Sequence, residues 1–266
     1  ARGLGDSTLL AAVDVAALIG LRVPHTADVA AAALADLNSL ADADPSILHD
    51  AGVAVWLSRA RLEAGDLVGA RKCLDAVTDA HIDGDPELRW LVDYGRLGLA
   101  LAAGELVECD RLLTRIRAVP PSPTDRGYYG RLLPALTALG TLRGDLSEIA
   151  GQSESMRSRF DTNPVLRPAL AVALLDAGDR AGASELLEWY TPQRLDAITV
   201  DPMWLSTIVL IARAASDLVM KTLCEYIYRM LLDFGDCVDA AGACTFCEMF
   251  NTIDNLAVDC DLFDNG

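Results

Sequence analysis

The chain has 266 residues, of which 52% are hydrophobic, so it holds enough apolar material for one large domain or two small ones. Its 39 acidic and 22 basic residues give a formal net charge of −17, which argues against direct nucleic-acid binding because phosphate backbones require clustered Lys and Arg. No run reaches the roughly 18 uninterrupted apolar residues of a membrane span, and no secretion signal opens the chain. We therefore expect neither nucleic acid nor membrane as a partner.

The cysteines indicate a reducing compartment. Their number is odd, the chain is long, and no secretion signal precedes them. We therefore expect reduced, mostly buried thiols in a cytoplasmic protein. The cysteines are Cys73, Cys109, Cys224, Cys237, Cys244, Cys247 and Cys260.

The pattern of apolar residues predicts an all-α chain. Alternating β-branched runs between turn signals are not evident, whereas helical spacing recurs throughout. In chain order, the predicted helices cover residues 7–19, 27–41, 46–63, 66–80, 86–103, 105–118, 125–142, 145–159, 164–177, 179–190, 201–215, 218–234 and 241–256.

A glycine followed by an acidic residue recurs between predicted helices. Glycine adopts the left-handed conformation that ends a helix at low cost, and the acid next to it can cap the following helix. This local chemistry predicts antiparallel helix pairs joined by structural hinges. The hinges are Gly65-Asp66, Gly104-Glu105, Gly144-Asp145 and Gly178-Asp179, whose glycines are 39, 40 and 34 residues apart.

The spacing of these hinges is typical of tetratricopeptide-like solenoids. We expect residues 1–200 to form such repeats and residues 201–266 to form a degenerate repeat or cap of the same superhelix. A fifth hinge is expected around Ser216-Asp217, where the glycine is missing. The alternative is a globular all-α domain in which the Gly-acid turns recur by coincidence.

Several stretches resemble one known family, the tetratricopeptide-like region of large bacterial regulators. These regulators are the MalT-like, LuxR-family ATPases and their relatives that carry an adenylate-cyclase-type domain. Residues 1–13, ARGLGDSTLLAAV, resemble the family's ARxxGDxxTLAAV. Further resemblance lies in the run 143–187, in DPMWLSTIVLIARAASDL (201–218) and in LCEYIYRMLLDFGD (223–236), where Asp233 and Phe234 replace the usual Pro and Tyr.

The resemblance implies a non-catalytic sensor or scaffold region within a multidomain signalling or transcriptional regulator. In that family an ATPase precedes the repeats and a helix-turn-helix often follows them. This chain has neither a G-x-x-x-x-G-K-[ST] phosphate loop nor a basic recognition helix, and it begins inside a repeat-like stretch, so we expect a segment of a longer protein. A free-standing adaptor that binds peptides, or a helical enzyme with an unrecognised site, are the alternatives.

A partner or effector is expected on the first helices of the pairs, which line the concave face of a solenoid. Aromatic residues and arginines are favoured anchors at such surfaces, although core packing is the alternative for each of them. The partner would be a protein or a small molecule, and the chain could also self-associate. The predicted groove residues are Trp90, Tyr94, Tyr128, Arg131 and Arg167.

The C-terminal cysteines are a weak candidate for a metal site. Cys237, Cys244, Cys247 and Cys260 could supply four thiolates to zinc, but a single CxxC is a much weaker signal than two. Cys244 and Cys247 lie in a predicted helix, where small core residues are the plainer interpretation. We therefore predict no metal, no cofactor and no catalytic residue in this segment.

Overall fold

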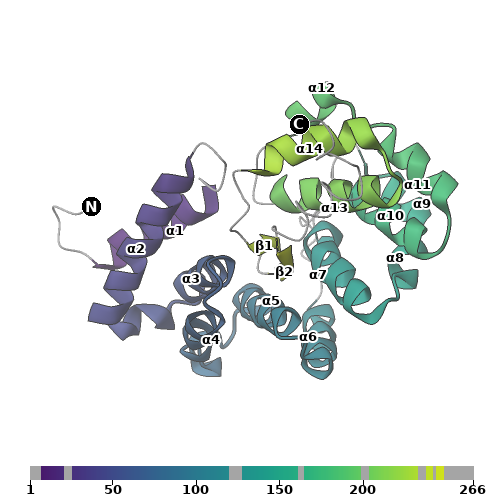
Figure 1. Ribbon diagram of the computed structural model, residues 1–266. Coiled ribbons are helices and arrows are strands. Elements are labelled where there is room, and N and C mark those ends of the chain that lie inside the picture. The colour runs from purple at the N-terminus through teal and green to yellow at the C-terminus, as the bar shows by residue number, and fades with distance from the viewer. Residues whose placement is uncertain are drawn as a thin grey trace. The chain divides into compact units, whose positions relative to one another are not determined.

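The structure is a computed structural model (Figure 1). It describes residues 7–20, 26–119, 128–160, 165–198 and 204–232, together with the backbone of 238–241 and 244–248. Within these ranges the ordered elements are helices, apart from one two-stranded sheet. None of the helices described is long and apolar enough to cross a membrane.

The chain forms two compact units. Unit 1 comprises residues 1–120 with 242–245, and unit 2 comprises residues 121–241 with 246–266. This division falls between two prolines, Pro120 and Pro121. The predicted boundary between residues 200 and 201 separates regular repeats from a degenerate repeat or cap, and it stays a prediction.

Unit 1 consists of helices that pack in consecutive pairs. α1 packs against α2, α3 against α4 and α5 against α6, and α3 also contacts α1 and α5. Leucines such as Leu57, Leu97 and Leu112 are fully buried between them. The bounds are α1 (Ser7–Gly20), α2 (Ala27–Ala43), η2 (Pro45–His49), α3 (Ala51–Glu63), α4 (Leu67–Asp75), η3 (Asp79–His81), α5 (Pro86–Ala102) and α6 (Leu106–Ala118).

Unit 2 also consists of helices that pack in pairs. α10 packs against α11 and α13, and α13 packs against α14. The bounds are α7 (Tyr128–Arg143), α8 (Ser147–Ala150), α9 (Ser153–Arg157), α10 (Leu166–Asp176), α11 (Arg180–Leu187), α12 (Pro192–Asp196), α13 (Trp204–Asp217) and α14 (Lys221–Leu231). The two strands are β1 (Val238–Ala241) and β2 (Cys244–Glu248), of which Cys244 and Thr245 belong to unit 1.

The four hinge glycines adopt the left-handed conformation expected of them. Their φ angles are +78° at Gly65, +69° at Gly104, +66° at Gly144 and +82° at Gly178. At each turn the glycine N–H donates to the carbonyl three residues earlier, and the next N–H donates to the carbonyl five residues before itself. These two bonds satisfy carbonyls that the helix end leaves free.

The fifth turn has the same hydrogen bonds without a glycine. Val219 N donates to Ser216 O at 2.9 Å, and Met220 N donates to Ala215 O at 2.9 Å. Val219 has a φ of +56° and lies 41 residues after Gly178. The predicted position, Ser216-Asp217, is therefore too early, because α13 continues to Asp217 before the chain turns.

Four predicted helices differ from the structure. The predicted helix 66–80 ends at Asp75, the last residue of α4, and the short 3-10 helix η3 follows it. The predicted helix 46–63 is interrupted at Asp50, whose side chain accepts from Val53 N at 3.0 Å and starts α3 afresh. The predicted helix 145–159 is divided into α8 and α9 at Gly151 and Gln152.

The prediction of a helix at 241–256 is wrong for residues 244–248, which form strand β2, paired with β1. Thr245 and Phe246 are residue types that favour strands. The remaining residues of that prediction, apart from Ala241 in β1, lie outside the described residues.

Candidate functional site

Trp90 and Tyr94, two of the predicted groove residues, are buried in unit 1. One turn apart on α5, their rings stack with centroids 4.8 Å apart and planes inclined by 14°. Trp90 is 7% exposed and Tyr94 is 3% exposed. In this structure the two rings therefore pack in the core, which was the alternative for each predicted groove residue. Their role as groove anchors stays a prediction.

A buried carboxylate lies beside this aromatic pair. Asp93 has a side chain only 2% exposed, and its Oδ2 forms an ion pair with Arg115 Nε at 3.0 Å, which joins α5 to α6. Arg96 Nη1 lies 3.8 Å from Oδ1, which is too far for a hydrogen bond. Burial raises the pKa of Asp93 despite the lowering effect of Arg115 and Arg96.

Arg96 extends the network to the preceding helix pair. Its Nη2 donates to Val77 O at 3.0 Å and to Leu74 O at 3.3 Å, at the C-terminal end of α4. A guanidinium is well placed there, because the end of a helix presents free carbonyls and a negative dipole. Asp93, Arg96 and Arg115 thus connect three helices, and the arrangement is that of a structural polar network.

Arg167, the predicted groove arginine of α10, lies in a stack of aromatic and cationic side chains. Its guanidinium carbon is 4.4 Å from the centroid of Phe160 and 4.7 Å from that of Trp189, and Arg194 lies 4.6 Å from the same Trp189 ring. Arg194 Nη1 also donates to Trp189 O at 2.9 Å. The stack fastens the ends of α9, α10, α11 and α12 together, so packing accounts for much of the position of Arg167.

The remaining predicted site residues are described only in part. Tyr128 and Arg131 lie on α7 by their backbone, but their side chains are outside the described residues. Cys244 and Cys247 lie in β2, whereas Cys237 and Cys260 fall outside the described residues. The argument that Cys244 and Cys247 share one helical face is therefore wrong, and the zinc candidate stays untested.

Three other cysteines have described side chains. Cys73, Cys109 and Cys224 form no disulfide and are buried, so the prediction of buried side chains is confirmed for these three. Burial raises the pKa of the Cys73 thiol. In the part of the chain that the structure describes, no group of three or more His, Cys, Asp or Glu residues could hold a metal ion.

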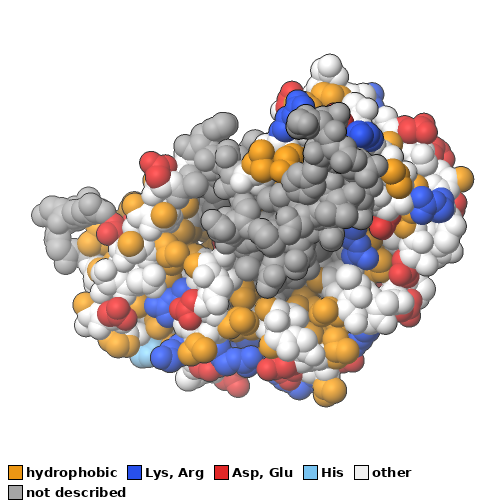
Figure 2. Space-filling model, viewed as in Figure 1, with side chains coloured by type: hydrophobic (Ala, Val, Ile, Leu, Met, Phe, Trp, Pro, Cys, Tyr) orange, Lys and Arg blue, Asp and Glu red, His pale blue; other side chains and the backbone are white. Residues whose placement is uncertain are grey.

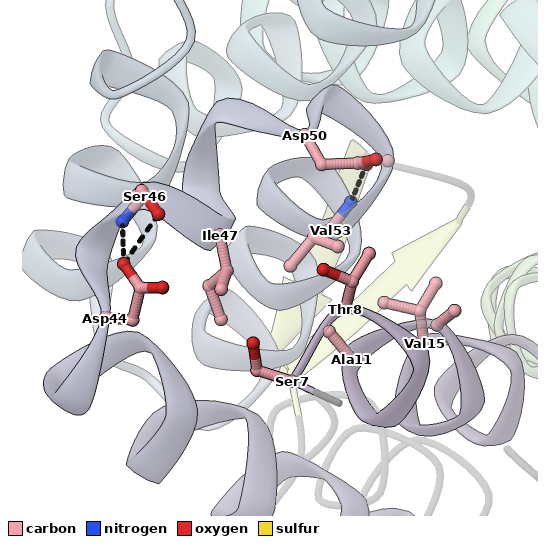
Figure 3. Close-up of a pocket in the computed structure, with 11 residues that line it drawn as sticks. Ser7, Thr8, Ala11, Val15, Asp44, Ser46, Ile47, Asp50 and Val53 are labelled. Atoms are coloured by element: carbon pink, nitrogen blue, oxygen red, sulfur yellow. Dashed lines mark hydrogen bonds between the residues drawn. The ribbon is translucent and has the colours of Figure 1, made fainter. Parts of the chain in front are cut away.

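A cavity of about 360 Å³ lies in unit 1 between α1, η2 and the start of α3 (Figure 3). This volume is at the lower end of the range of small-molecule sites, roughly 300–1,000 Å³. The apolar side chains of Ala11, Val15, Ile47 and Val53 line it, and its polar groups come from Ser7, Thr8, Asp44, Ser46 and Asp50.

The two carboxylates at this cavity already have partners. Asp44 Oδ1 accepts from Ser46 N at 3.0 Å and from Ser46 Oγ at 2.6 Å, and these bonds lower the pKa of Asp44. Asp50 caps α3 through Val53 N. Both acids therefore serve as helix caps, and the cavity by itself identifies no class of ligand.

The turn ends of α4 and α6 expose apolar side chains at matching positions. Val68 is 69% exposed and Val107 is 86% exposed, each preceded by a partly exposed leucine. Arg71 Nη2 lies 3.1 Å from Glu105 Oε1, which holds α4 beside the second turn. On the face shown in Figure 2, basic, acidic and hydrophobic side chains are interspersed over the region of α4 and α6. Exposed apolar residues at the same position of successive pairs are a candidate contact surface.

Sequence reasoning missed two of these features. Nothing in the spacing predicted the pairing of Asp93 with Arg115 or the sharing of Trp189 by two arginines. A charged residue inside the apolar run WLVDYGRL was the one available signal for Asp93. No family model, curated protein or solved structure matches the chain.

Proposed function

We propose that the chain is a non-catalytic helical-repeat region of a multidomain bacterial signalling or transcriptional regulator, where it binds an effector or a protein partner. The observation that carries the proposal is the fivefold recurrence of one turn geometry, at Gly65, Gly104, Gly144, Gly178 and Val219. Stacked units of one design create an extended surface suited to binding. The sequence resemblance to the MalT-like, LuxR-family regulators supports the same assignment.

The proposed architecture is a solenoid of antiparallel helix pairs in a cytoplasmic protein. Contacts between successive first helices, α1 with α3, α3 with α5 and α10 with α13, support stacking within each unit. The Arg71–Glu105 ion pair and the Arg96 bonds to the end of α4 are further links between neighbouring pairs.

The reading frame around this segment tests the multidomain part of the proposal. We expect an ATPase or cyclase-type domain, or a helix-turn-helix, in the same frame. Stop codons close to both ends would contradict it and would favour a free-standing adaptor that binds peptides.

The role in binding is tested by transcript profiling of the native host when it carries variants of the intact protein. The double variant Val68→Ser, Val107→Ser removes the most exposed apolar side chains at the turn ends and should change the same transcripts as deletion of the gene. Val13→Ser is the matched control, because Val13 is 50% exposed in the middle of α1 and not at the start of a second helix. An unchanged profile in the double variant would contradict a role for this surface.

A further inference from the structure

The α13–α14 turn differs from the other four in one residue. All five turns share the same pair of backbone hydrogen bonds, but a valine occupies the left-handed position in the fifth. Left-handed backbone brings the Cβ of an L-residue too close to a carbonyl oxygen, and β-branched residues tolerate it least. Val219 is therefore strained where Gly65, Gly104, Gly144 and Gly178 are not.

Packing of the valine side chain does not offset this strain. Val219 is 63% exposed, so it buries little apolar area. The strain is imposed by the surrounding hydrogen bonds, including one from Arg180 Nη2 to Asp217 O at 2.8 Å. The joint is thus held in an unfavourable conformation by its neighbours.

The helix that follows this joint also begins without a side-chain cap. Met220 at the N-cap of α14 makes no side-chain hydrogen bond. In contrast, Asp66 accepts from Gly69 N at 2.8 Å to start α4, and Asp179 accepts from Gly182 N at 2.9 Å to start α11. α14 therefore lacks both the glycine and the acid that begin those second helices.

α14 is attached mainly to one neighbour. Among the described elements it packs chiefly on α13, whereas α11 packs on both α10 and α13. Its apolar face is the set Leu223, Cys224, Ile227 and Leu231. One exposed hydrogen bond, from Tyr226 Oη to Asp196 Oδ1 at 2.5 Å, links it to α12.

We propose that the α13–α14 turn is a strained joint that lets α14 detach from α13 while α10, α11 and α13 stay folded. Local opening of this kind draws on the least stable part of a structure. The detached state relaxes Val219 to an ordinary backbone conformation and exposes the apolar faces of α13 and α14. The proposal does not depend on the proposed function, because it concerns only the energetics of unit 2.

Hydrogen exchange of the full 266-residue chain, followed by mass spectrometry, tests the joint. In Val219→Gly we expect exchange of residues 221–231 to slow about threefold to fivefold, because relief of the strain exceeds the entropy cost of glycine. Exchange in α10 and α11 should not change. Val219→Ala keeps the Cβ and most of the strain, so it should slow exchange of α14 much less.

The reciprocal variant is Gly178→Val, which places valine in the fourth turn. A Cβ at Gly178 would meet no atom within 4 Å, so the change acts through the backbone alone. We expect faster exchange of α11 by a similar factor. Unchanged exchange of α14 in Val219→Gly, or an equal slowing throughout unit 2, would overturn the proposal.

Discussion

The turns of the α5–α6 and α13–α14 pairs have the same geometry, but the two pairs differ in how strongly they are stabilised. Both turns use the same two backbone hydrogen bonds, but the first is made by Gly104 and the second by Val219. The first pair is also crossed by the buried contact between Asp93 and Arg115. The two backbone hydrogen bonds therefore define the geometry of the turn. The residue at the left-handed position and the side-chain contacts between the two helices determine how stable the pair is.

The largest effect is expected from removing the ion pair of the firmer α5–α6 pair. Arg115→Met leaves the carboxylate of Asp93 buried without its closest partner, and we expect a loss of about 2–3 kcal/mol in the free energy of unfolding. Urea denaturation followed by circular dichroism measures it. Arg111→Met is the control, because Arg111 pairs with the more exposed Glu108 and should cost at most about 0.5 kcal/mol. Equal losses in the two variants would contradict a special role for Asp93.

Gly104→Val gives the α5–α6 turn the residue found in the α13–α14 turn. A Cβ at Gly104 meets no atom within 4 Å, so only the left-handed backbone opposes the change. We expect a loss of about 1–2 kcal/mol in the free energy of unfolding. An unchanged melting temperature would show that Gly104 is not left-handed in solution.

The pH dependence of stability should distinguish Asp93 from an exposed acid. Burial raises its pKa in the folded state, so the folded protein binds this proton more tightly than the unfolded chain does. Its contribution to stability therefore falls as pH rises from its ordinary pKa, 3.8, through the raised value.

Asp93→Asn removes this dependence. The variant should gain stability relative to the parent as pH rises across that window. Denaturation of both proteins at a series of pH values measures the difference. A difference that does not vary with pH would contradict the raised pKa.

A smaller gain is expected from repairing the weaker α13–α14 pair. Met220→Asp supplies the side-chain cap that Asp66 and Asp179 give to α4 and α11, and it should add about 0.5–1 kcal/mol to the local stability of α14. Hydrogen exchange of residues 221–231 measures this gain. Met220→Asn supplies a neutral cap and so separates the effect of the hydrogen bond from that of the charge. No gain in either variant would show that the missing cap does not limit the local stability of α14.

The glycine turns were predictable because their cause is local. A glycine next to an acid determines both the helix end and the next start, so α3–α4, α5–α6 and α10–α11 follow from the sequence. The predicted position of the fifth turn is too early because no glycine or other turn-favouring residue marks the turn at Val219. Its geometry comes from the hydrogen bonds of the helices on either side.

The candidate site was much less predictable, because its contacts join distant residues. Asp93 and Arg115 are 22 positions apart, and their meeting depends on how α5 and α6 are rotated about their axes. Arg167 was singled out as a groove residue, yet its aromatic neighbours Phe160 and Trp189 come from two other segments of the chain. Trp90 and Tyr94 were predicted to line a groove from a first helix, but both side chains are buried in this structure.

Hydrogen exchange of Gly104→Val tests the repeat architecture most directly. In a stacked array each helix pair contacts only its neighbours, so a weakened pair should loosen itself and adjacent pairs alone. We predict faster exchange in α5 and α6, a smaller increase in α3 and α4, and no change in α13. A uniform increase throughout the described helices would contradict the array and would show that the chain opens as a single cooperative domain.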